Sequence, residues 1–476
     1  MESRLKINRS GFSEIYQREI GLSQSRSFAH RIAGSEAIVE KIDLYGKLNA
    51  RDGSVNTVHF NSTGDFIVSG SGDTQVIFWD WAAKSKRLAF SSGHSDNIFQ
   101  ARIMPFTDDR TVITSAADGQ VRLGQVWENG GVETNRLGKH QGSVHSLAIE
   151  PGSPHIFYSC GEDGFVQQFD LRSRSSAKLF ACSSLKENKR PGSIRLNAIV
   201  IDPRNSTYFA IGGYDGYTRV YDIRSYQQES SSSDSLVNTF CPPDLVGTDN
   251  IHITGLAYSN SSELVVSYND ELGYMFQKNM GLGSNPHSVS PENLKRLDRP
   301  QVYLGHRNSQ TVKGVSFFGH SDEYVVSGSD CGHIFIWKKS GELVHLMVGD
   351  KHIVNCLVSH PFLPVLATSG IEKDVKIWVP MANDRSPLPK NVKEIMEANK
   401  QGREDRSRRT LTPDVIMHVL RLQRRQPLTY IDRRYTRSDL ESDEEDEGET
   451  YILGFADDDA SSEGGFTNNS RDCNIS

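Results

Sequence analysis

Short stretches in which apolar and polar residues alternate recur along the chain, and tight turns separate them. In the clearest example, every second residue from Ile156 to Cys160 would face the same side of a strand. The turn Gly-Glu-Asp-Gly follows, and Phe165–Asp170 predicts a second strand. An Asp-Gly turn between two such runs is typical of a β-hairpin. Because one hairpin cannot bury both of its faces alone, the pattern predicts several hairpins that pack together.

A fixed spacing indicates that this hairpin is a repeat. A turn aspartate precedes an aromatic residue by six positions in four places: Asp73 and Trp79, Asp163 and Phe169, Asp215 and Tyr221, and Asp270 and Phe276. We recognise seven segments, at intervals close to the ~40–45 residues of a four-stranded propeller blade. They are Val55–Trp81, Gly93–Val126, His140–Ser173, Ile194–Ser225, Ile253–Lys278, Gly305–Trp337 and Ile353–Pro380. The fold class predicted is all-β, a seven-bladed β-propeller, since radial stacking of sheets buries both faces of each one.

The repeat text resembles that of WD-repeat propellers. Gly-His stands near some segment starts, a turn aspartate follows, and the segments close in Trp-Asp or a variant of it. Two segments depart from this pattern, because the second ends in Leu-Gly-Gln-Val at 123–126 and the sixth has Cys331 at the turn position. The resemblance implies that each sequence repeat is offset from a blade by one strand. The outer strand of the last blade would then come from Ile38–Leu48 and close the ring.

Composition outside the repeats predicts four parts of the chain. Residues 1–37 read as a polar N-terminal extension, 38–380 as the propeller, 381–437 as a basic, partly helical segment, and 438–476 as an acidic disordered tail. Helices are expected over Asn391–Lys400 and from Thr412 onward, where Thr-Pro-Asp is typical of a helix start. Eleven acidic residues and no basic residue lie between Ser438 and Asp459, which favours disorder. Three insertions interrupt the regular spacing: Leu179–Gly192, Tyr226–Asp249 and Asn279–Arg299. The second contains four consecutive serines and the third is rich in Gly, Asn, Ser and Pro, so these two predict exposed loops.

Charge and cysteine usage narrow the function classes. The net charge of −7 over 476 residues argues against a general nucleic-acid binder. Ten arginines between Gln401 and Arg437 are interpreted as a solvated basic helix or an import signal. Six cysteines without a C-x-x-C pair read as reduced thiols of an intracellular protein, and no metal or cofactor is expected. No run of eighteen apolar residues exists, so no membrane span is predicted.

The sequence contains no motif of a common catalytic site, and we predict that the protein is not an enzyme. Phosphate loops of the P-loop type, H-E-x-x-H and G-x-S-x-G are all absent. His140, Ser159 and Asp163 invite comparison with a catalytic triad. Because similar residues recur from blade to blade, whereas a catalytic constellation occurs once, hydrogen bonding within the blades is the favoured interpretation.

Two consecutive blades end in the same sequence motif, an aromatic residue followed by Asp, any residue and Arg. The first ends Phe-Asp-Leu-Arg at 169–172, and the second ends Tyr-Asp-Ile-Arg at 221–224. This ending resembles the box by which some WD-repeat proteins dock onto the DNA damage-binding protein 1 adaptor of cullin-4 ubiquitin ligases. The resemblance implies an adaptor-binding site at Asp170, Arg172, Asp222 and Arg224. The alternative is that each arginine merely pairs with an aspartate on the propeller rim.

Several less generic segments extend the resemblance over about Leu44–Pro380. They are IVSGSGD at 67–73, YSCGEDG at 158–164, SYNDE at 267–271, SGSDCGH at 327–333 and DVKIW at 374–378. They are similar to segments of the eighth type of DNA damage-binding protein 1 and cullin-4-associated factor. This family implies a substrate receptor that binds the adaptor, and through it cullin-4, and presents a client in the nucleus and cytoplasm. The alternative is a WD-repeat scaffold or chromatin-associated binding module without a ligase role, and the client's identity is not readable from the sequence.

Overall fold

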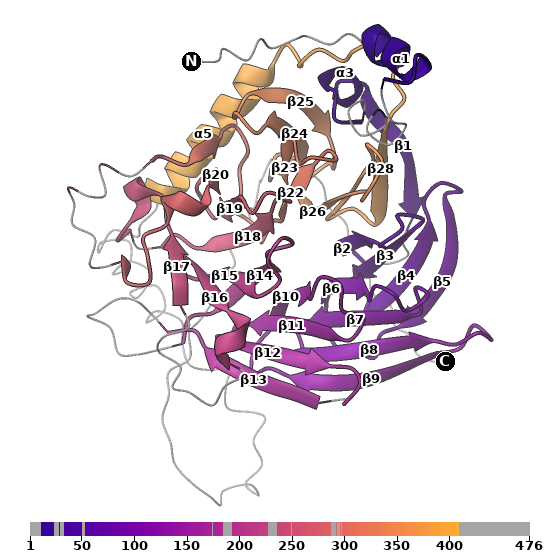
Figure 1. Ribbon diagram of the computed structural model, residues 1–476, viewed down its shortest axis with the longest axis vertical. Coiled ribbons are helices and arrows are strands. Elements are labelled where there is room, and N and C mark those ends of the chain that lie inside the picture. The colour runs from indigo at the N-terminus through magenta and orange to yellow at the C-terminus, as the bar shows by residue number, and fades with distance from the viewer. Residues whose placement is uncertain are drawn as a thin grey trace, which may run out of the picture. The chain divides into compact units, whose positions relative to one another are not determined.

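The chain forms a ring of small antiparallel sheets, as the computed structural model in Figure 1 shows. It describes residues 11–22, 28, 33–49, 53–173, 175–183, 193–226, 236–248, 250–286, 292, 296 and 298–408. Within these residues, twenty-eight strands form seven sheets of four strands each. The prediction of a seven-bladed β-propeller is confirmed.

The first four sheets follow the chain in order. They consist of β2 (Val55–Phe60), β3 (Phe66–Ser71), β4 (Gln75–Asp80) and β5 (Ser85–Ser91); β6 (Ile98–Ile103), β7 (Thr111–Ala116), β8 (Gln120–Val126) and β9 (Val132–Lys139); β10 (Val144–Ile149), β11 (Ile156–Gly161), β12 (Phe165–Asp170) and β13 (Ser175–Ala181); and β14 (Leu196–Ile201), β15 (Tyr208–Gly213), β16 (Thr218–Asp222) and β17 (Leu236–Phe240).

The remaining three sheets complete the ring. They consist of β18 (Ile253–Tyr258), β19 (Leu264–Tyr268), β20 (Gly273–Phe276) and β21 (Gln301–Tyr303); β22 (Val315–Phe318), β23 (Tyr324–Gly328), β24 (His333–Lys338) and β25 (Leu343–Val348); and β26 (Val354–Ser359), β27 (Leu366–Gly370), β28 (Asp374–Pro380) and β1 (Ile42–Asn49). The helical elements are α1 (Gly11–Glu19), α3 (Glu36–Val39), η1 (Ile223–Tyr226), η2 (Pro243–Leu245), η3 (Lys278–Met280) and α5 (Val392–Arg408).

The hydrophobic core lies between neighbouring sheets. The first strand of every sheet contacts the first strand of the next, from β2 through β6, β10, β14, β18 and β22 to β26 and back to β2. One apolar cluster, for example, joins Val58 and Trp79 of the first blade to Ala367 and Ile377 of the seventh. Because both faces of a blade are covered in this way, its middle strands are buried almost along their whole length.

The ring is closed by a strand from the amino-terminal side of the chain. β1 pairs antiparallel with β28, with Leu44 opposite Trp378 and Leu48 opposite Val375. The predicted one-strand offset is therefore present. The predicted start of this strand at Ile38 is wrong, because Glu36–Val39 forms the short helix α3, whose Val39 is fully buried in the cluster that includes the sixth blade.

The insertion predicted over Tyr226–Asp249 is not simply a loop. Leu236–Phe240 forms β17, the outer strand of the fourth blade, and pairs with β16. Phe240 is 5% exposed and packs against Phe276 of the fifth blade. The serine-rich half of this insertion, at 230–233, lies outside the described residues.

Two blades each contain a buried histidine–aspartate pair. In the third blade, His140 Nδ1 lies 2.8 Å from Asp163 and Nε2 lies 2.7 Å from Ser159 Oγ. In the second blade, His94 contacts Asp118 and Thr114 in the same way. All these side chains are buried. Each histidine therefore satisfies two buried polar groups, the carboxylate of the turn aspartate and the hydroxyl of the strand that precedes the turn.

The sixth blade lacks this pair, because Cys331 occupies the position of the turn aspartate. The ring nitrogens of His306 have no hydrogen-bond partner among the described residues. Asp330 lies one position earlier and forms a buried ion pair with Lys313, while its Oδ2 accepts a hydrogen bond of 2.6 Å from the Ser309 backbone N–H. The carboxylate is therefore retained, but it holds the neighbouring loop rather than the histidine.

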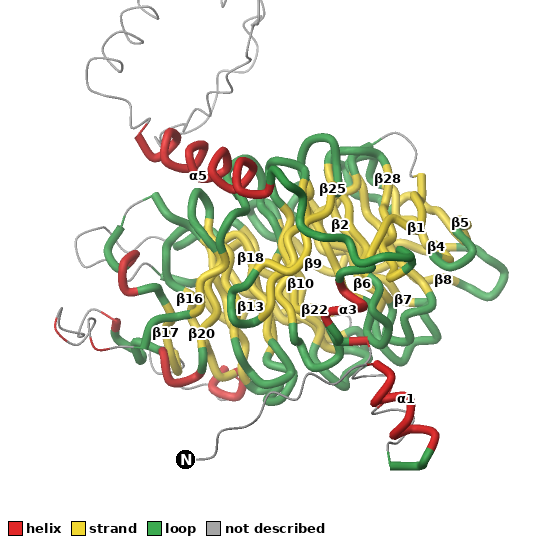
Figure 2. The backbone as a smooth tube through the Cα atoms, turned by 90° about the horizontal axis from the view of Figure 1, so that it is seen from above, coloured by secondary structure: helices red, strands yellow, loops and turns green. Residues whose placement is uncertain are grey.

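Helix α5 covers the sixth blade where the pair is missing. The helix predicted over Asn391–Lys400 is present and extends to Arg408. Asn399, only 4% exposed, donates to the Gly305 carbonyl at 2.8 Å and to Cys331 Sγ at 3.2 Å, and Arg403 donates to the His306 carbonyl. Figure 2 shows α5 lying across one side of the ring. The helix start predicted at Thr412 and the acidic tail from Ser438 lie outside the described residues.

The described cysteines carry no disulfide. Cys160, Cys182, Cys241, Cys331 and Cys356 are free thiols, which confirms that part of the prediction. No described helix combines the length and apolar character needed to span a bilayer.

Removing β1 should destabilise the whole ring. A variant that begins at Val55 lacks Ile42 and Leu48, which are 2% and 1% exposed, and exposes the edge of β28. Burial of each such side chain contributes about 1.5–3 kcal/mol. We expect a melting temperature lowered by about 6 °C or more, or aggregation, in a thermal melt. A variant that begins at Ser35 keeps β1 and is the control; equal melting of the two variants would refute the role of closure.

Two histidine variants should differ in their effect on stability. His140→Phe leaves Asp163 and Ser159 without their buried partner, which should cost about 2–4 kcal/mol. His306→Phe removes no side-chain hydrogen bond among the described residues and keeps a ring beside Trp337, so its cost should stay below about 1 kcal/mol. Urea unfolding measures both values. A larger loss for His306→Phe than for His140→Phe would contradict this account.

The same histidine predicts a loss of stability in mild acid. Burial, with the nearby Arg403 and Lys313 cations, lowers the pKa of His306 to about 3. The unfolded chain, with an ordinary pKa near 6.5, therefore takes up a proton that the folded chain does not. Stability is complete above about pH 6.5 and declines toward pH 3, by about 2 kcal/mol at pH 5. Urea unfolding at pH 7 and pH 5 should show this part of the pH dependence removed in His306→Phe; an unchanged pH dependence would argue against it.

Candidate partner-docking face

The two aromatic-Asp-x-Arg endings have almost the same geometry. Arg172 donates from Nε and Nη2 to Asp170 at 3.0 and 2.8 Å, and its backbone N–H donates to the same carboxylate at 2.9 Å. Arg224 makes the equivalent three bonds to Asp222 at 3.0, 2.6 and 2.9 Å. The pairing of each arginine with a rim aspartate, which the alternative interpretation predicted, is thus present in the free chain.

The local sequence explains this geometry. In each box the aspartate ends the third strand of its blade, and its carboxylate accepts the N–H two residues later, as in an Asx-turn. The preceding aromatic residue is buried: Phe169 stacks on Phe157 at 4.7 Å, and Tyr221 packs on Phe209 at 5.6 Å. A buried ring and an Asx-turn therefore fix where each arginine leaves the blade.

Both arginines remain available to a partner. Their side chains are 63% and 65% exposed, and no hydrogen bond of either Nη1 atom is found among the described residues. Hydrogen bonds from Arg172 lower the pKa of the Asp170 carboxyl to about 2, and Arg224 lowers that of Asp222. Because exposed ion pairs contribute little to folding, these contacts mainly hold the guanidinium groups in place.

The boxes lie on the same face of the ring. Within each box, a backbone N–H donates to a carbonyl in the loop between the first and second strands of the same blade: Leu171 to His155, and Ile223 to Thr207. Helix α5 contacts Gly305 and Cys331, which belong to the connections at the opposite ends of the strands. The predicted site residues therefore occupy equivalent positions in neighbouring blades, on the side away from α5.

His140 contacts Asp163 and Ser159 as the histidine of a catalytic triad contacts its partners. The three side chains are, however, not accessible to a substrate. The His140 side chain is 0% exposed, Asp163 is 4% exposed, and Ser159 is fully buried. The equivalent group of the second blade has Thr114 in place of the serine. A substrate could not reach these atoms, and the repetition supports a structural role. Within the described residues, no cluster of three or more metal-ligating side chains occurs.

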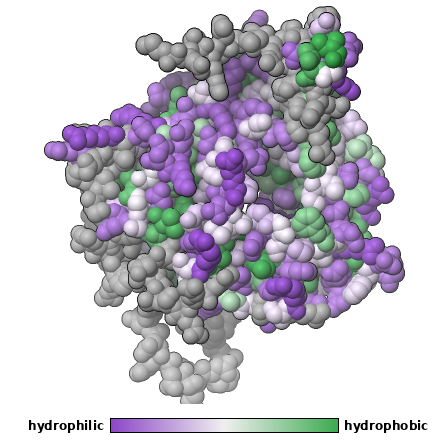
Figure 3. Space-filling model, in the orientation of Figure 1, coloured by the Kyte–Doolittle hydropathy of each residue, from purple (hydrophilic) through white to green (hydrophobic). Residues whose placement is uncertain are grey.

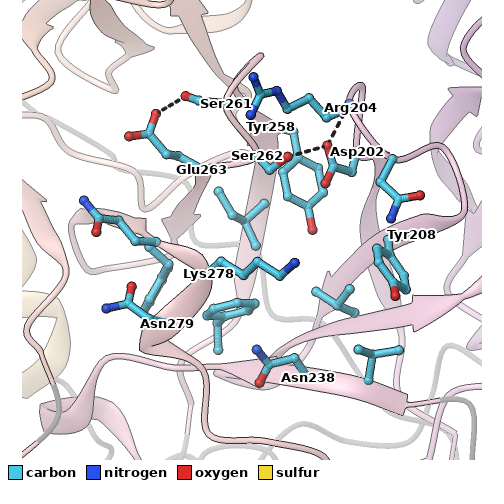
Figure 4. Close-up of a pocket in the computed structure, with 17 residues that line it drawn as sticks. Asp202, Arg204, Tyr208, Asn238, Tyr258, Ser261, Ser262, Glu263, Lys278 and Asn279 are labelled. Atoms are coloured by element: carbon cyan, nitrogen blue, oxygen red, sulfur yellow. Dashed lines mark hydrogen bonds between the residues drawn. The ribbon is translucent and has the colours of Figure 1, made fainter.

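One feature near the second box was not predicted. A pocket of about 590 Å³ lies between the fourth and fifth blades, and Tyr208, which lines it, pairs in register with Asp222. Figure 4 shows the residues around this pocket. They come from five separate segments of the chain, so no spacing in the sequence could have indicated the pocket. The ring face turned to the viewer in Figure 3 is mainly polar, with separate apolar areas and a hollow near its middle.

Comparison with known families agrees with the geometry. Residues 43–80, 131–170 and 298–338 match the family "WD domain, G-beta repeat". Each match takes in the outer strand of one blade and the first three strands of the next, which is the predicted offset. The fold is a propeller built from WD40 repeats.

Proteins from human, mouse and Arabidopsis thaliana are similar to this chain. The chain is 30% identical over 274 residues to DDB1- and CUL4-associated factor 6 of Homo sapiens and of Mus musculus, covering 55% of this chain and 31% of theirs. It is 28% identical over 292 residues to Protein ALTERED SEED GERMINATION 2 of Arabidopsis thaliana, covering 55% of this chain and 39% of that one. The match thus spans about a third of each relative. Assignment to the eighth type of associated factor stays a prediction.

Proposed function

We propose that this protein is a substrate receptor of a cullin-4 RING ubiquitin ligase, which docks on the DNA damage-binding protein 1 adaptor through Asp170, Arg172, Asp222 and Arg224. The observation that carries the proposal is the repetition of one exposed, pre-oriented arginine in two consecutive blades. The name of the relatives from human and mouse supports it. The proposed role is binding, in the nucleus and cytoplasm, and the ubiquitin transfer itself would belong to other subunits.

The geometry suits arginine-based docking. Each carboxylate accepts two hydrogen bonds from one edge of the guanidinium, the edge formed by Nε and Nη2. This leaves Nη1 available to a partner and reduces the entropy lost on binding. Arginine is common among interface hot spots, especially where the partner excludes water. Two anchors on neighbouring blades also fix the orientation of the partner better than a single anchor could.

A second candidate function has one observation in its favour. Because both arginines already pair with their own aspartates, the boxes could serve only to hold the strand ends of a WD-repeat scaffold or a chromatin-associated binding module. Such a protein would bind partners elsewhere and would not need the adaptor. The two functions predict different effects of removing the arginines, since only a substrate receptor would lose adaptor binding.

Changing both arginines to alanine should abolish most adaptor binding without unfolding the ring. Loss of a buried interface arginine commonly costs ~2 kcal/mol or more, so Arg172→Ala with Arg224→Ala should weaken binding by roughly two orders of magnitude or more. The melting temperature should change little, because exposed ion pairs contribute only ~0–1 kcal/mol. A pull-down of the purified adaptor, with a thermal melt of each variant, measures both.

The first blade offers a matched control. Arg87 pairs with Asp80 at 2.7 Å and is 59% exposed, but it is not part of an aromatic-Asp-x-Arg box. Arg87→Ala should therefore leave adaptor binding unchanged. Wild-type capture of the adaptor by the double variant would leave the scaffold interpretation in place. If the double variant unfolded, Arg172→Lys and Arg224→Lys would retain the charge and test docking separately.

A further inference from the structure

The pocket beside the second box has an apolar floor shared by two blades. Val220 and Phe240 come from the fourth blade, and Leu264 and Phe276 come from the fifth. All four side chains are buried in the core, whereas Val237 at the rim is 45% exposed. With a volume of about 590 Å³, this groove accommodates one or two large side chains.

The carboxylates at the rim of the groove are already engaged. Asp202 Oδ1 accepts hydrogen bonds of 2.9 Å from the Arg204 backbone N–H and from Ser262 Oγ. Glu263 forms an ion pair with Lys339 at 2.5 Å and accepts a bond from Ser261. Figure 4 shows the contacts of Asp202 and Glu263 at one edge of the pocket. Glu263 is therefore already paired with a cation, whereas Asp202 accepts hydrogen bonds from neutral groups and keeps its negative charge.

Two cations of the groove have no ion-pair partner among the described residues. Arg204 lies in the loop between β14 and β15, and Lys278 begins η3 after the fifth blade. Both are exposed, and neither side chain has a hydrogen-bond or ion-pair partner among the described residues. In Figure 4 the Lys278 side chain crosses the middle of the pocket, between Tyr258 and Asn238 in that view. Because Glu263 is paired with Lys339, these two cations outnumber Asp202, the one lining carboxylate without an ion-pair partner among the described residues. The groove therefore carries a net positive charge above an apolar floor.

We infer that this groove binds a short acidic segment of a partner protein, which inserts an aromatic or large aliphatic side chain between flanking carboxylates. The apolar floor gains from burial of one such side chain. Because the cations come from different blades, they suit carboxylates on both sides of it, as a peptide can offer. A small inorganic anion would leave the floor uncovered. The site is separate from Arg172 and Arg224 and does not depend on adaptor docking.

A randomised peptide library displayed on phage tests this on the full chain. Selected peptides are expected to carry Asp or Glu on both sides of Phe, Tyr, Trp or Leu. Their affinity is then measured by fluorescence anisotropy. Arg204→Glu with Lys278→Glu should weaken it by about tenfold or more, since two attractive charges become repulsive. Lys86→Glu, which changes an exposed lysine of the first blade, should have no effect.

Two further comparisons separate the groove from general electrostatics and from the adaptor site. A selected peptide with serine in place of its aromatic residue should also bind about tenfold more weakly. Arg172→Ala, which changes only the box of the third blade, should bind the peptide like wild type, so failure of the adaptor experiment leaves this result intact. The inference is overturned if no acidic peptide is selected, if the serine peptide binds equally well, or if Lys86→Glu weakens binding as much as the groove variant does.

Discussion

The fold depends on the fact that no blade can bury its own faces. Each sheet is four strands wide, and its middle strands carry apolar residues on both sides, such as Val68 and Ile67 of β3 or Val112 and Ile113 of β7. Only the two neighbouring sheets can cover these residues, so the blades stabilise one another in a ring. The ring has no free end once β1 pairs with β28. The exposed turns and connections are consequently concentrated at the rims of the ring.

Much of this architecture was predictable because each repeat is defined by residues that lie close together in the sequence. The spacing of turn aspartates and aromatic residues predicted the hairpins, and the seven copies of the repeat predicted the number of blades. The pairing of Asp170 with Arg172 was also predictable from sequence, because its geometry is local: carboxylate and guanidinium are two positions apart. The equivalent pair in the fourth blade followed from the same text.

What the sequence did not reveal depends on contacts between distant segments. Nothing near Cys331 indicates that a helix about seventy positions later covers it, since the bond from Asn399 becomes visible only in three dimensions. The strand at Leu236–Phe240 was hidden within an insertion, because it is only five residues long. The groove between the fourth and fifth blades likewise combines Arg204 and Lys278, which share no motif. Local patterns predicted the blades, whereas their modifications arise from tertiary contacts.

Ring closure also imposes an order on events during synthesis of the chain. Leu48 pairs with Val375, so more than three hundred residues must be made before β1 meets its partner strand. At ~5–20 residues per second, this separates the two strands by roughly 15–65 s. Throughout that time the edge of β1 and the outward face of the newest blade have no cover. The growing chain is therefore exposed to edge pairing with other chains, and the last blade, rather than the first, commits the protein to its folded state.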